Sequence, residues 1–249
     1  MFLALYLSNW LFNFIINALS FTNMVLHKVV NESYNQIASK FSKSRNKPWL
    51  EFDLYNKIAE PNSNILDIGC GNGRLLLSLN KPGIAYTALD ISSEMLVQAK
   101  QNLASVNCQK TFVCSNFLDA KLRANSFDSI FSVACLHHIH GFWNRLAFLN
   151  AIYDCLKPNS TACVSVWNLW QPRYAKNFKQ AAKKSLFARR DLNIKFGQTA
   201  RYYHAFGFWE LKFLVFCSKF RACDILFVDK QQYLPSQKNS HNMILILNK

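Results

Sequence analysis

Acidic residues, glycine and proline are scarce in this chain. Its 249 residues include 14 acidic against 29 basic side chains, and only seven glycines and six prolines. The eight cysteines form no Cys-x-x-Cys pair and no Cys/His cluster at zinc spacing, which argues against a structural zinc site and against a disulfide-stapled secreted domain. We therefore expect no bound metal, and we expect the cysteines to be small core residues of a cytoplasmic protein.

The shortage of acids leaves a formal net charge of +15. An excess of this size predicts attraction to a polyanion such as RNA, DNA or an acidic membrane surface. The chain length fits one α/β domain with additions, and it is sufficient to bury a substantial core.

Charge of either sign is absent from residues 1–26, which are rich in Leu, Phe, Ile and Trp. The segment is long enough to span a bilayer. However, Asn9, Asn13 and Asn17 recur at every fourth residue and would place a polar stripe on one face of a helix. No basic residue precedes the apolar run, which argues against a signal peptide. Three interpretations stay open: a membrane anchor or interfacial helix, a helix packed on the body, or an upstream extension before a start at Met24.

Three of the seven glycines lie within five residues, directly after a run typical of a buried strand. The stretch 65–73 reads Ile-Leu-Asp-Ile-Gly-Cys-Gly-Asn-Gly, and it predicts a strand that ends in a tight turn before a helix. In open α/β sheets ligands bind at the carboxyl ends of strands, where glycines let a nucleotide-sized ligand touch the main chain. Gly69, Gly71 and Gly73 alternate strictly, unlike the spacing that seats a pyrophosphate. With Asp67 just before them, the loop suits a cationic ligand.

A second acid, Asp90, ends the next predicted strand, Tyr86–Leu89. It lies about 20 residues after the glycine loop, where a carboxylate can accept hydrogen bonds from ribose hydroxyl groups. Further strands are predicted at 111–114, 129–134 and 161–167, with helices between them. This alternation predicts an α/β fold with a doubly wound, mostly parallel sheet, and the residues from 27 to 58 predict helices that cap it.

Residues 168–200 break this alternation. They hold basic residues, with no acid before Asp191, interleaved with aromatic residues: Arg173, Lys176, Lys179, Lys183, Lys184, Arg189 and Arg190, with Trp170, Tyr174, Phe178 and Phe187. Cations for phosphates and aromatic rings for bases are typical of a nucleic-acid surface. The alternative is a solvated helix that uses Phe178 and Leu186 as core residues.

The glycine loop with its two acids resembles motif I and the following acidic residue of class I S-adenosylmethionine (SAM)-dependent methyltransferases. Further stretches resemble the tRNA wobble-uridine carboxymethyl methyltransferase family, namely Arg-x-Lys-Pro-Trp (45–49), Leu-His-His-Ile (136–139) and Arg-Tyr-Tyr-His (201–204). The resemblance covers most of residues 25–247. It implies a Rossmann-like, seven-stranded, mostly parallel sheet with an N-terminal helical cap, in a methyltransferase domain over residues 27–249. It also implies a basic substrate-binding insertion at about residues 168–204.

The same resemblance implies SAM as the cofactor and a tRNA substrate, whose 5-carboxymethyl wobble uridine becomes a methyl ester. The residues implied for cofactor binding are Asp67, Gly69, Gly71, Gly73, Asp90 and Asn116. A carboxylate is already ionised at neutral pH, so this reaction needs positioning rather than a general base. Our candidates to hold the carboxylate are Arg45 and Arg201, with Tyr202, His204 and His138 as donors nearby.

Other interpretations stay open beside this one. The segment Asn168–Gln171 departs from the family's usual Ala-x-Glu-Gln beside the substrate loop, so the exact nucleoside is undecided. A SAM-dependent methyltransferase that acts on a small molecule or lipid would share the cofactor half and could use residues 1–26 to meet a membrane. A non-catalytic protein that binds RNA or a partner is a third class. The resemblance also leaves open whether a small activator protein is needed.

Overall fold

The computed structural model describes residues 28–45, 47–184, 189–197 and 199–249. The interpretations of residues 1–26 therefore lie outside the described residues. Among the residues that are described, no helix has both the length and the hydropathy that crossing a membrane requires.

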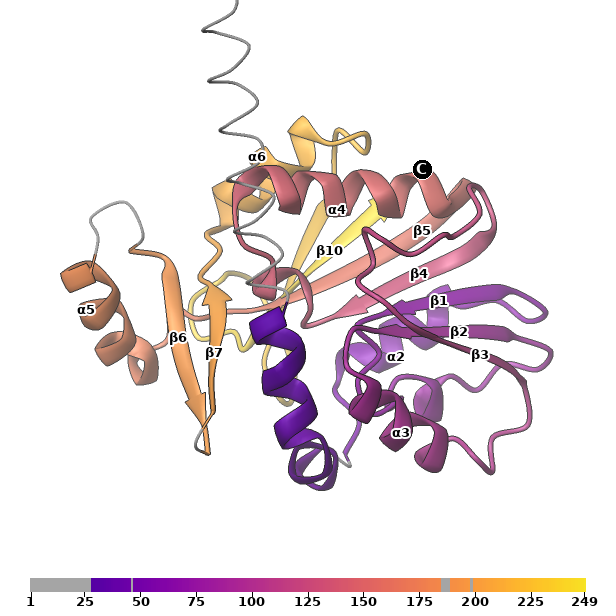
Figure 1. Cartoon of the computed structure of the whole chain (residues 1–249). Helices are drawn as coiled ribbons and strands as arrows, with labels where there is room; N and C mark the ends of the chain where they lie inside the picture. Colours follow the sequence, from indigo (N-terminus) through magenta and orange to yellow (C-terminus); the bar gives the residue numbers. More distant parts are fainter. Residues whose placement is uncertain (1–27, 46, 185–188, 198) are drawn as a thin grey trace, which may run out of the picture.

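A single large sheet organises the fold (Figure 1). Its strand order is β3-β2-β1-β4-β5-β10-β8-β9. The strands are β1 (Asn64–Ile68), β2 (Ala85–Asp90), β3 (Gln109–Cys114), β4 (Phe127–Val133), β5 (Leu156–Trp167), β8 (Asp224–Val228), β9 (Tyr233–Leu234) and β10 (Asn242–Asn248). The first five pair in parallel, whereas β10, β8 and β9 pair antiparallel. The predicted doubly wound, mostly parallel sheet is confirmed, and the short β9 makes it eight-stranded rather than seven-stranded.

Helices cover both faces of this sheet, above and below it in Figure 1. One face packs against α4 (Phe142–Cys155) and α6 (Phe208–Cys217), and the other against α2 (Glu51–Ile58) and α3 (Ser93–Asn102). Successive strand residues point to opposite faces, so Ile130 joins the core below α4 while Phe131 joins the core above α2. We expected α2 to belong to the cap, but it packs on a face of the sheet.

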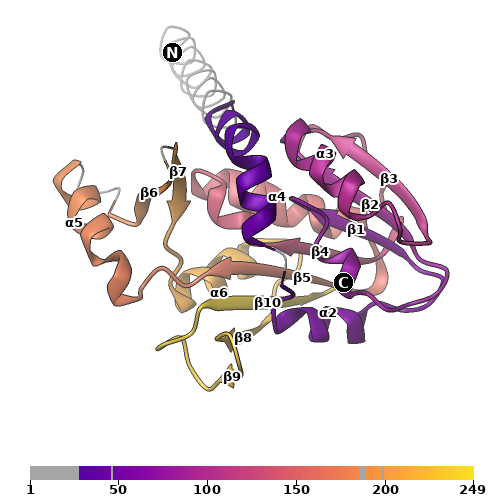
Figure 2. The same cartoon turned by 90° about the horizontal axis from the view of Figure 1, so that it is seen from below.

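A third layer lies beyond the carboxyl ends of the strands (Figures 1 and 2). It consists of a helix over residues 28–44, the hairpin β6 (Asp191–Phe196) and β7 (Thr199–His204), and α5 (Ala175–Lys184), which contacts β6. Both views show the helix 28–44 between the hairpin and the sheet. The residues whose sequence breaks the βα alternation thus form their own antiparallel unit, with a small core around Leu192 and Tyr203. This layer stands over the edge of the sheet where the glycine loop ends.

Candidate cofactor and substrate site

The glycine loop leaves its main chain exposed to a pocket at the end of β1. Gly69, Gly71 and Gly73 have φ angles of 71°, 55° and 76°, a region that L-residues with side chains rarely adopt. The amide N–H groups of Gly69 and Cys70 both donate to the Leu89 carbonyl oxygen, at 2.8 and 3.0 Å. The loop is therefore held against the end of β2, and its residues Gly69, Cys70 and Gly71 line the pocket.

Asp90, at the end of β2, is fixed by two main-chain donors. Its Oδ2 accepts from the Gly71 N–H at 2.8 Å, and its Oδ1 accepts from the Ser92 N–H at 2.9 Å. Ser92 also caps α3 through the Met95 N–H at 3.1 Å, as the sequence predicts. Burial raises the pKa of Asp90, and the two N–H donors oppose that shift. Each carboxylate oxygen has a further lone pair, which suits the two hydroxyl groups of a ribose.

Asp67 is a buried carboxyl group with one unsatisfied oxygen. Its Oδ2 accepts from the Tyr86 hydroxyl at 2.5 Å, whereas its Oδ1 has no hydrogen-bond partner. Burial raises the pKa of Asp67 to about 7, and the Tyr86 hydroxyl only partly offsets this effect. Because a buried unpaired carboxylate is unfavourable, the site would be stabilised by a cationic donor such as an ammonium group.

Arg74 provides the opposite charge on the same side of the pocket. Its guanidinium lies 4.3 Å from the ring centroid of Trp49, and its Nη1 donates to the Lys47 carbonyl oxygen at 3.2 Å. Burial lowers its pKa to about 10, so it remains a cation at neutral pH. Within the described part of the chain it forms no ion pair. A carboxyl group and a guanidinium that form no ion pair within the described residues match the α-ammonium and α-carboxylate groups of an amino acid.

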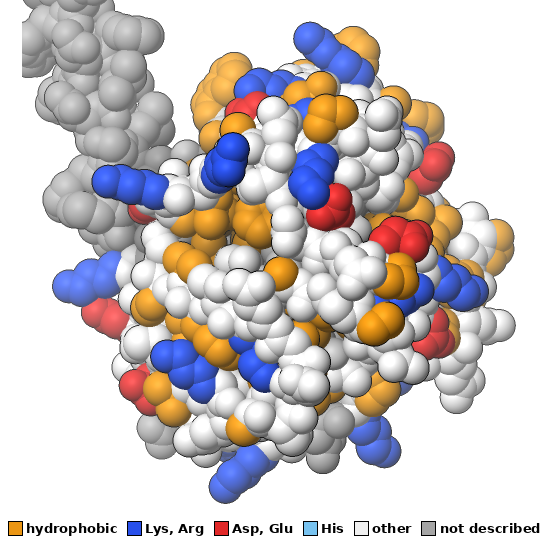
Figure 3. All heavy atoms as spheres, turned by 90° about the vertical axis from the view of Figure 1, so that its right-hand side faces the viewer, with side chains coloured by type: hydrophobic (Ala, Val, Ile, Leu, Met, Phe, Trp, Pro, Cys, Tyr) orange, Lys and Arg blue, Asp and Glu red, His pale blue; other side chains and the backbone are white. Residues whose placement is uncertain are grey.

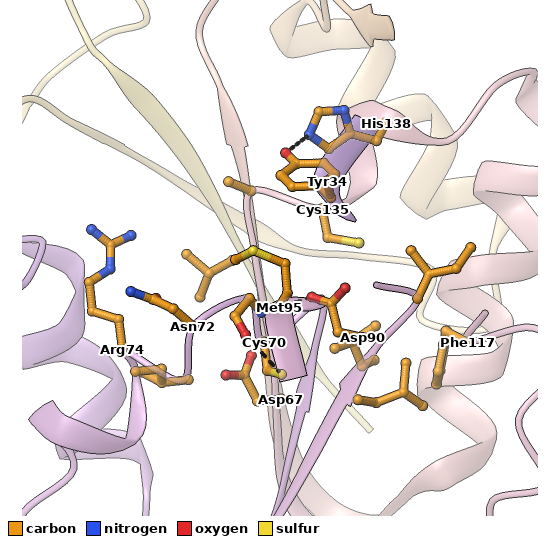
Figure 4. A pocket seen from close by; sticks show the side chains of 18 of the residues that line it. Tyr34, Asp67, Cys70, Asn72, Arg74, Asp90, Met95, Phe117, Cys135 and His138 are labelled. Carbon is orange, nitrogen blue, oxygen red and sulfur yellow. Dashed lines mark hydrogen bonds between the residues drawn. The ribbon is translucent and has the colours of Figure 1, made fainter. Parts of the chain in front are cut away.

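Figure 4 shows how these groups divide the pocket. Asp90 and Phe117 lie on one side, Arg74 and Asn72 on the other, and Met95 lies between them. The arrangement fits a ligand with a nucleoside at one end and an amino acid at the other, which is the composition of SAM. Asn116 lines the nucleoside end, but its Nδ2 donates to Asp119 at 3.0 Å and its Oδ1 accepts from the Leu118 N–H at 3.3 Å.

A chain of hydrogen bonds closes the pocket opposite the glycine loop, where Figure 4 shows Tyr34, Cys135 and His138. Arg201 Nη1 donates to the Tyr34 hydroxyl at 3.0 Å, and this hydroxyl lies 2.8 Å from His138 Nε2. His138 Nδ1 lies 2.8 Å from the Tyr202 carbonyl oxygen, which only accepts, so the Nδ1 atom carries the proton. Burial lowers the pKa of His138 to about 3. His138 is therefore neutral and accepts from Tyr34, and it has no donor left for a substrate.

Arg201 is a buried cation surrounded by rings. Its side chain is 3% exposed, and its guanidinium lies 5.2–5.9 Å from the ring centroids of Tyr34, Phe41, Phe196 and Tyr203. No acidic side chain among the described residues pairs with it, and its Nε has no hydrogen-bond partner. Arg45 lines the pocket and lies 5.2 Å from the same Phe41 ring, and its Nε also lacks a partner. The fold thus brings the two predicted arginines to one aromatic ring.

Tyr202 and His204 face away from this pocket. The Tyr202 hydroxyl donates to Asp191 Oδ1 at 2.6 Å and accepts from Arg145 Nη2 at 2.9 Å. His204 places one ring nitrogen 2.7 Å from Asp191 and the other 2.6 Å from Glu210. These contacts connect the hairpin to α4 and α6. We therefore assign Tyr202 and His204 to the framework of the hairpin and not to the substrate site.

Three residues of the site escaped the sequence analysis: Tyr34, Asn72 and Arg74. Asn72 and Arg74 flank the last glycine of the loop, so their position in the motif was a usable signal. Tyr34 has the spacing of a core residue on a helix, and only its contact with Arg201 gives its hydroxyl group a role. In the described residues no group of three or more His, Cys, Asp or Glu side chains is arranged to hold a metal ion.

Comparisons with known proteins agree with this geometry. Residues 66–164 match the family described as "Methyltransferase domain". A curated relative from Xenopus tropicalis, tRNA (carboxymethyluridine(34)-5-O)-methyltransferase alkbh8, is 31% identical over 159 residues, 63% of this chain and 23% of that protein. The tRNA (carboxymethyluridine(34)-5-O)-methyltransferase of Schizosaccharomyces pombe is 29% identical over 164 residues, 65% of this chain and 67% of that protein. The chain therefore spans less than a quarter of the Xenopus relative.

Solved structures show the same fold. A SAM-dependent methyltransferase from Methanosarcina mazei has a TM-score of 0.63 at 22% identity, covering 79% of this chain and 98% of its own. A chain from a complex of the Haloferax volcanii Trm112 methyltransferase activator with a methyltransferase has a TM-score of 0.64 at 14% identity, covering 88% and 96%. The chain thus has the class I architecture of SAM-dependent methyltransferases, and its residues 66–164 match the methyltransferase domain family. Within that class it resembles the tRNA carboxymethyluridine methyltransferases.

Proposed function

We propose that this methyltransferase acts on tRNA and converts the carboxylate of a 5-carboxymethyl wobble uridine into its methyl ester. The observation that carries the proposal is Arg201, a buried cation that has no acidic partner among the described residues. The names of the curated relatives support the substrate.

The surroundings of Arg201 offset part of the cost of burying its charge. Removing an ion from water costs several kcal/mol, and each cation–π contact returns about 0.5–2 kcal/mol. The hydrogen bond to Tyr34 uses one of five N–H donors. A substrate carboxylate would supply the missing charge, and a guanidinium can hold both of its oxygens at once. Arg45, which lines the pocket, would approach the carboxylate from the cofactor side.

The chemistry asks the protein for alignment. SAM, when bound, supplies a methyl group on a positively charged sulfur. The substrate carboxylate is ionised at neutral pH, so none of these residues needs to remove a proton. The neutral His138 holds the Tyr34 hydroxyl, Tyr34 holds Arg201, and together they fix the direction from which a carboxylate meets the pocket.

The basic insertion from Arg173 to Arg190 supports an RNA substrate. Lys176, Lys179 and Lys183 are exposed on α5, and no acid interrupts them. On the opposite side of the molecule, at the amino ends of the parallel strands, basic, acidic and hydrophobic side chains are mixed (Figure 3). The small activator protein, the cytoplasmic location and membrane contact through residues 1–26 stay predictions.

Nucleoside mass spectrometry tests the reaction. Purified protein with SAM and tRNA from cells lacking this activity should give a methyl ester that mild alkali returns to the free acid. An alkali-stable methyl group on a ring atom or ribose would contradict the proposal. Transfer of labelled methyl into a lipid extract, with none into tRNA, would instead favour the small-molecule or lipid alternative.

Variants of Arg201 test the carboxylate clamp. Arg201→Ala should lower kcat/KM for tRNA by about a hundredfold or more, because alignment is lost, while the affinity for SAM is unchanged. Arg201→Lys should retain part of the activity, since an ammonium keeps the charge but cannot grip two oxygens. The exposed Arg123 at the opposite edge of the sheet serves as the matched control. Equal activity of Arg201→Ala and Arg123→Ala would exclude Arg201 from the clamp.

A further inference from the structure

A second pocket opens next to the candidate site, on the segment that follows β5. Its lining includes Trp170, Gln171, Gly207, Gln237, Lys238 and Asn239, and none of the described residues that line it is acidic. Trp167 lines the first pocket and Trp170 lines the second. The Cα atoms of these two residues are at most ~11 Å apart, so one short segment of chain contributes to both pockets.

Trp170 offers an oriented aromatic surface in this second pocket. Its ring stacks on Phe178 with centroids 4.8 Å apart and planes 26° apart, and its Nε1 donates to the Phe206 carbonyl oxygen at 2.8 Å. The side chain nevertheless remains 46% exposed. A large ring that is fixed in orientation but left accessible is suited to stacking with a nucleobase.

Cations and polar groups surround the ring. The Arg190 guanidinium lies 5.6 Å from the Trp170 ring centroid, and its Nη1 donates to Glu210 Oε2 at 2.6 Å. Lys238 lines the pocket, is exposed, and forms no ion pair within the described part of the chain. The Trp170 ring could stack with a base, the amide side chains of the pocket could hydrogen-bond to it, and Lys238 could pair with its phosphate.

The walls of the pocket are already in place. Asn168 is 2% exposed, and its Nδ2 donates to the carbonyl oxygens of Gln237 and Ser240 at 2.8 and 3.0 Å. Its Oδ1 accepts from the Trp170 N–H at 3.1 Å. One buried amide thus joins the segment after β5 to the loop before β10. A ligand therefore meets a preformed surface, which lowers the ordering cost of binding.

We propose that this second pocket binds the ribonucleotide adjacent to the target uridine in the RNA strand. The inference rests on the proposed function, because the target uridine would lie beside SAM, at the end of the first pocket that Tyr34 and Arg45 line. The base would stack on Trp170, and its phosphate would lie near Lys238. The pocket thereby contributes affinity and sequence context, and takes no part in the chemistry.

The test compares an RNA strand with an isolated nucleoside, using the full-length protein. Trp170→Ala should weaken binding of a fluorescein-labelled seven-nucleotide single-stranded RNA by about five- to a hundredfold, and Trp170→Phe should retain most of the affinity. Lys238→Glu should weaken binding and flatten its salt dependence. Methyl transfer to free 5-carboxymethyluridine should be unchanged in all three variants. Trp143→Ala, at an aromatic residue 73% exposed on α4, is the matched control.

Several outcomes would overturn the inference. One such outcome is that Trp170→Ala and Trp143→Ala bind the RNA equally well and that Lys238→Glu leaves both the RNA affinity and its salt dependence unchanged. Another is an equal loss of transfer to the free nucleoside, which would make Trp170 structural. Uridine monophosphate that binds as tightly as the heptamer, with the same dependence on Trp170, would identify a free-nucleotide site instead. If RNA binding depends on Trp170 but carboxymethyluridine is not methylated, the second pocket stands and the proposed reaction fails.

Discussion

The carboxyl group of Asp67 gives a quantitative test of the cofactor site. Burial raises its pKa to about 7 in the ligand-free protein, and its Oδ1 has no partner. An α-ammonium group can pair only with the carboxylate form. Below about pH 7, SAM binding must therefore remove the proton from Asp67. The Kd for SAM should then rise about tenfold for each unit by which the pH falls. The amide introduced by Asp67→Asn does not titrate, so this variant should bind SAM weakly, with a Kd that does not change over the same pH range.

Isothermal titration calorimetry between pH 5.5 and 8 measures this dependence. At a pH above the pKa of Asp67 both partners carry their charges, so the affinity should be greatest between about pH 7 and 8. Asp53→Asn, at an exposed acid on α2, is the matched control and should behave as the wild type. A wild-type affinity that does not change between pH 5.5 and 7 would refute the pairing of Asp67 with the ligand.

The same shift predicts how stability depends on pH without ligand. A carboxyl group with a folded-state pKa of about 7, against 3.8 ordinarily, holds its proton more tightly in the folded state. That stabilisation is present below about pH 4 and is lost as the pH rises through about 7. Three pKa units correspond to about 4 kcal/mol. In urea unfolding, Asp67→Asn should therefore exceed the wild type in stability at pH 8, and a lower stability would contradict the reasoning.

Other changes give further tests. Gly71→Val should abolish detectable SAM binding in calorimetry. The φ of Gly71 is 55°, which a β-branched residue rarely adopts, and even a Cβ atom there would lie 3.3 Å from Met95 Cε. A variant with unchanged affinity would disprove the loop assignment. Asp90→Ala should weaken SAM binding by removing the ribose acceptor, whereas an unaltered Kd would argue against that contact. Charge reversal at Lys179 and Lys183 should reduce the slope of log affinity for tRNA against log salt by about two. The controls are exposed lysines near the amino ends of the strands, Lys57 and Lys121.

Local sequence patterns predicted the sheet because its signals lie within a few residues of each other. The helix predicted between the strands at 129–134 and 161–167 is the observed α4, and the strand predicted before the glycine loop is β1. Alternating apolar residues and glycine turns report such elements directly. The hairpin β6–β7 was not predicted. Leu192 and Ile194 do alternate with polar neighbours, but we interpreted the cations before them as a nucleic-acid surface or, alternatively, a solvated helix.

Contacts between residues that are distant in the sequence are the part of the site that the sequence could not predict. Asp67, Asp90 and the glycines belong to two adjacent strands, so the fold class alone brings them together. Tyr34 and Arg201 meet only because the hairpin folds back onto the helix 28–44, and no local pattern in either segment indicates this partner. That no acidic side chain in the described part of the chain pairs with Arg201 is likewise a property of the folded neighbourhood and not of the motif.

The side chains of the Arg-Tyr-Tyr-His motif point to two different sides of the strand β7 and make different contacts there. Side chains alternate along β7, so Arg201 and Tyr203 face Tyr34 while Tyr202 and His204 face α4 and α6. On the second side Asp191 and Glu210 hold His204 between them. That polar network connects the hairpin to the helices, and the hairpin in turn presents Arg201. A guanidinium that aligns a carboxylate must be held within a fraction of an ångström, so in the proposed clamp the framework half of the motif would determine how well Arg201 positions a substrate carboxylate.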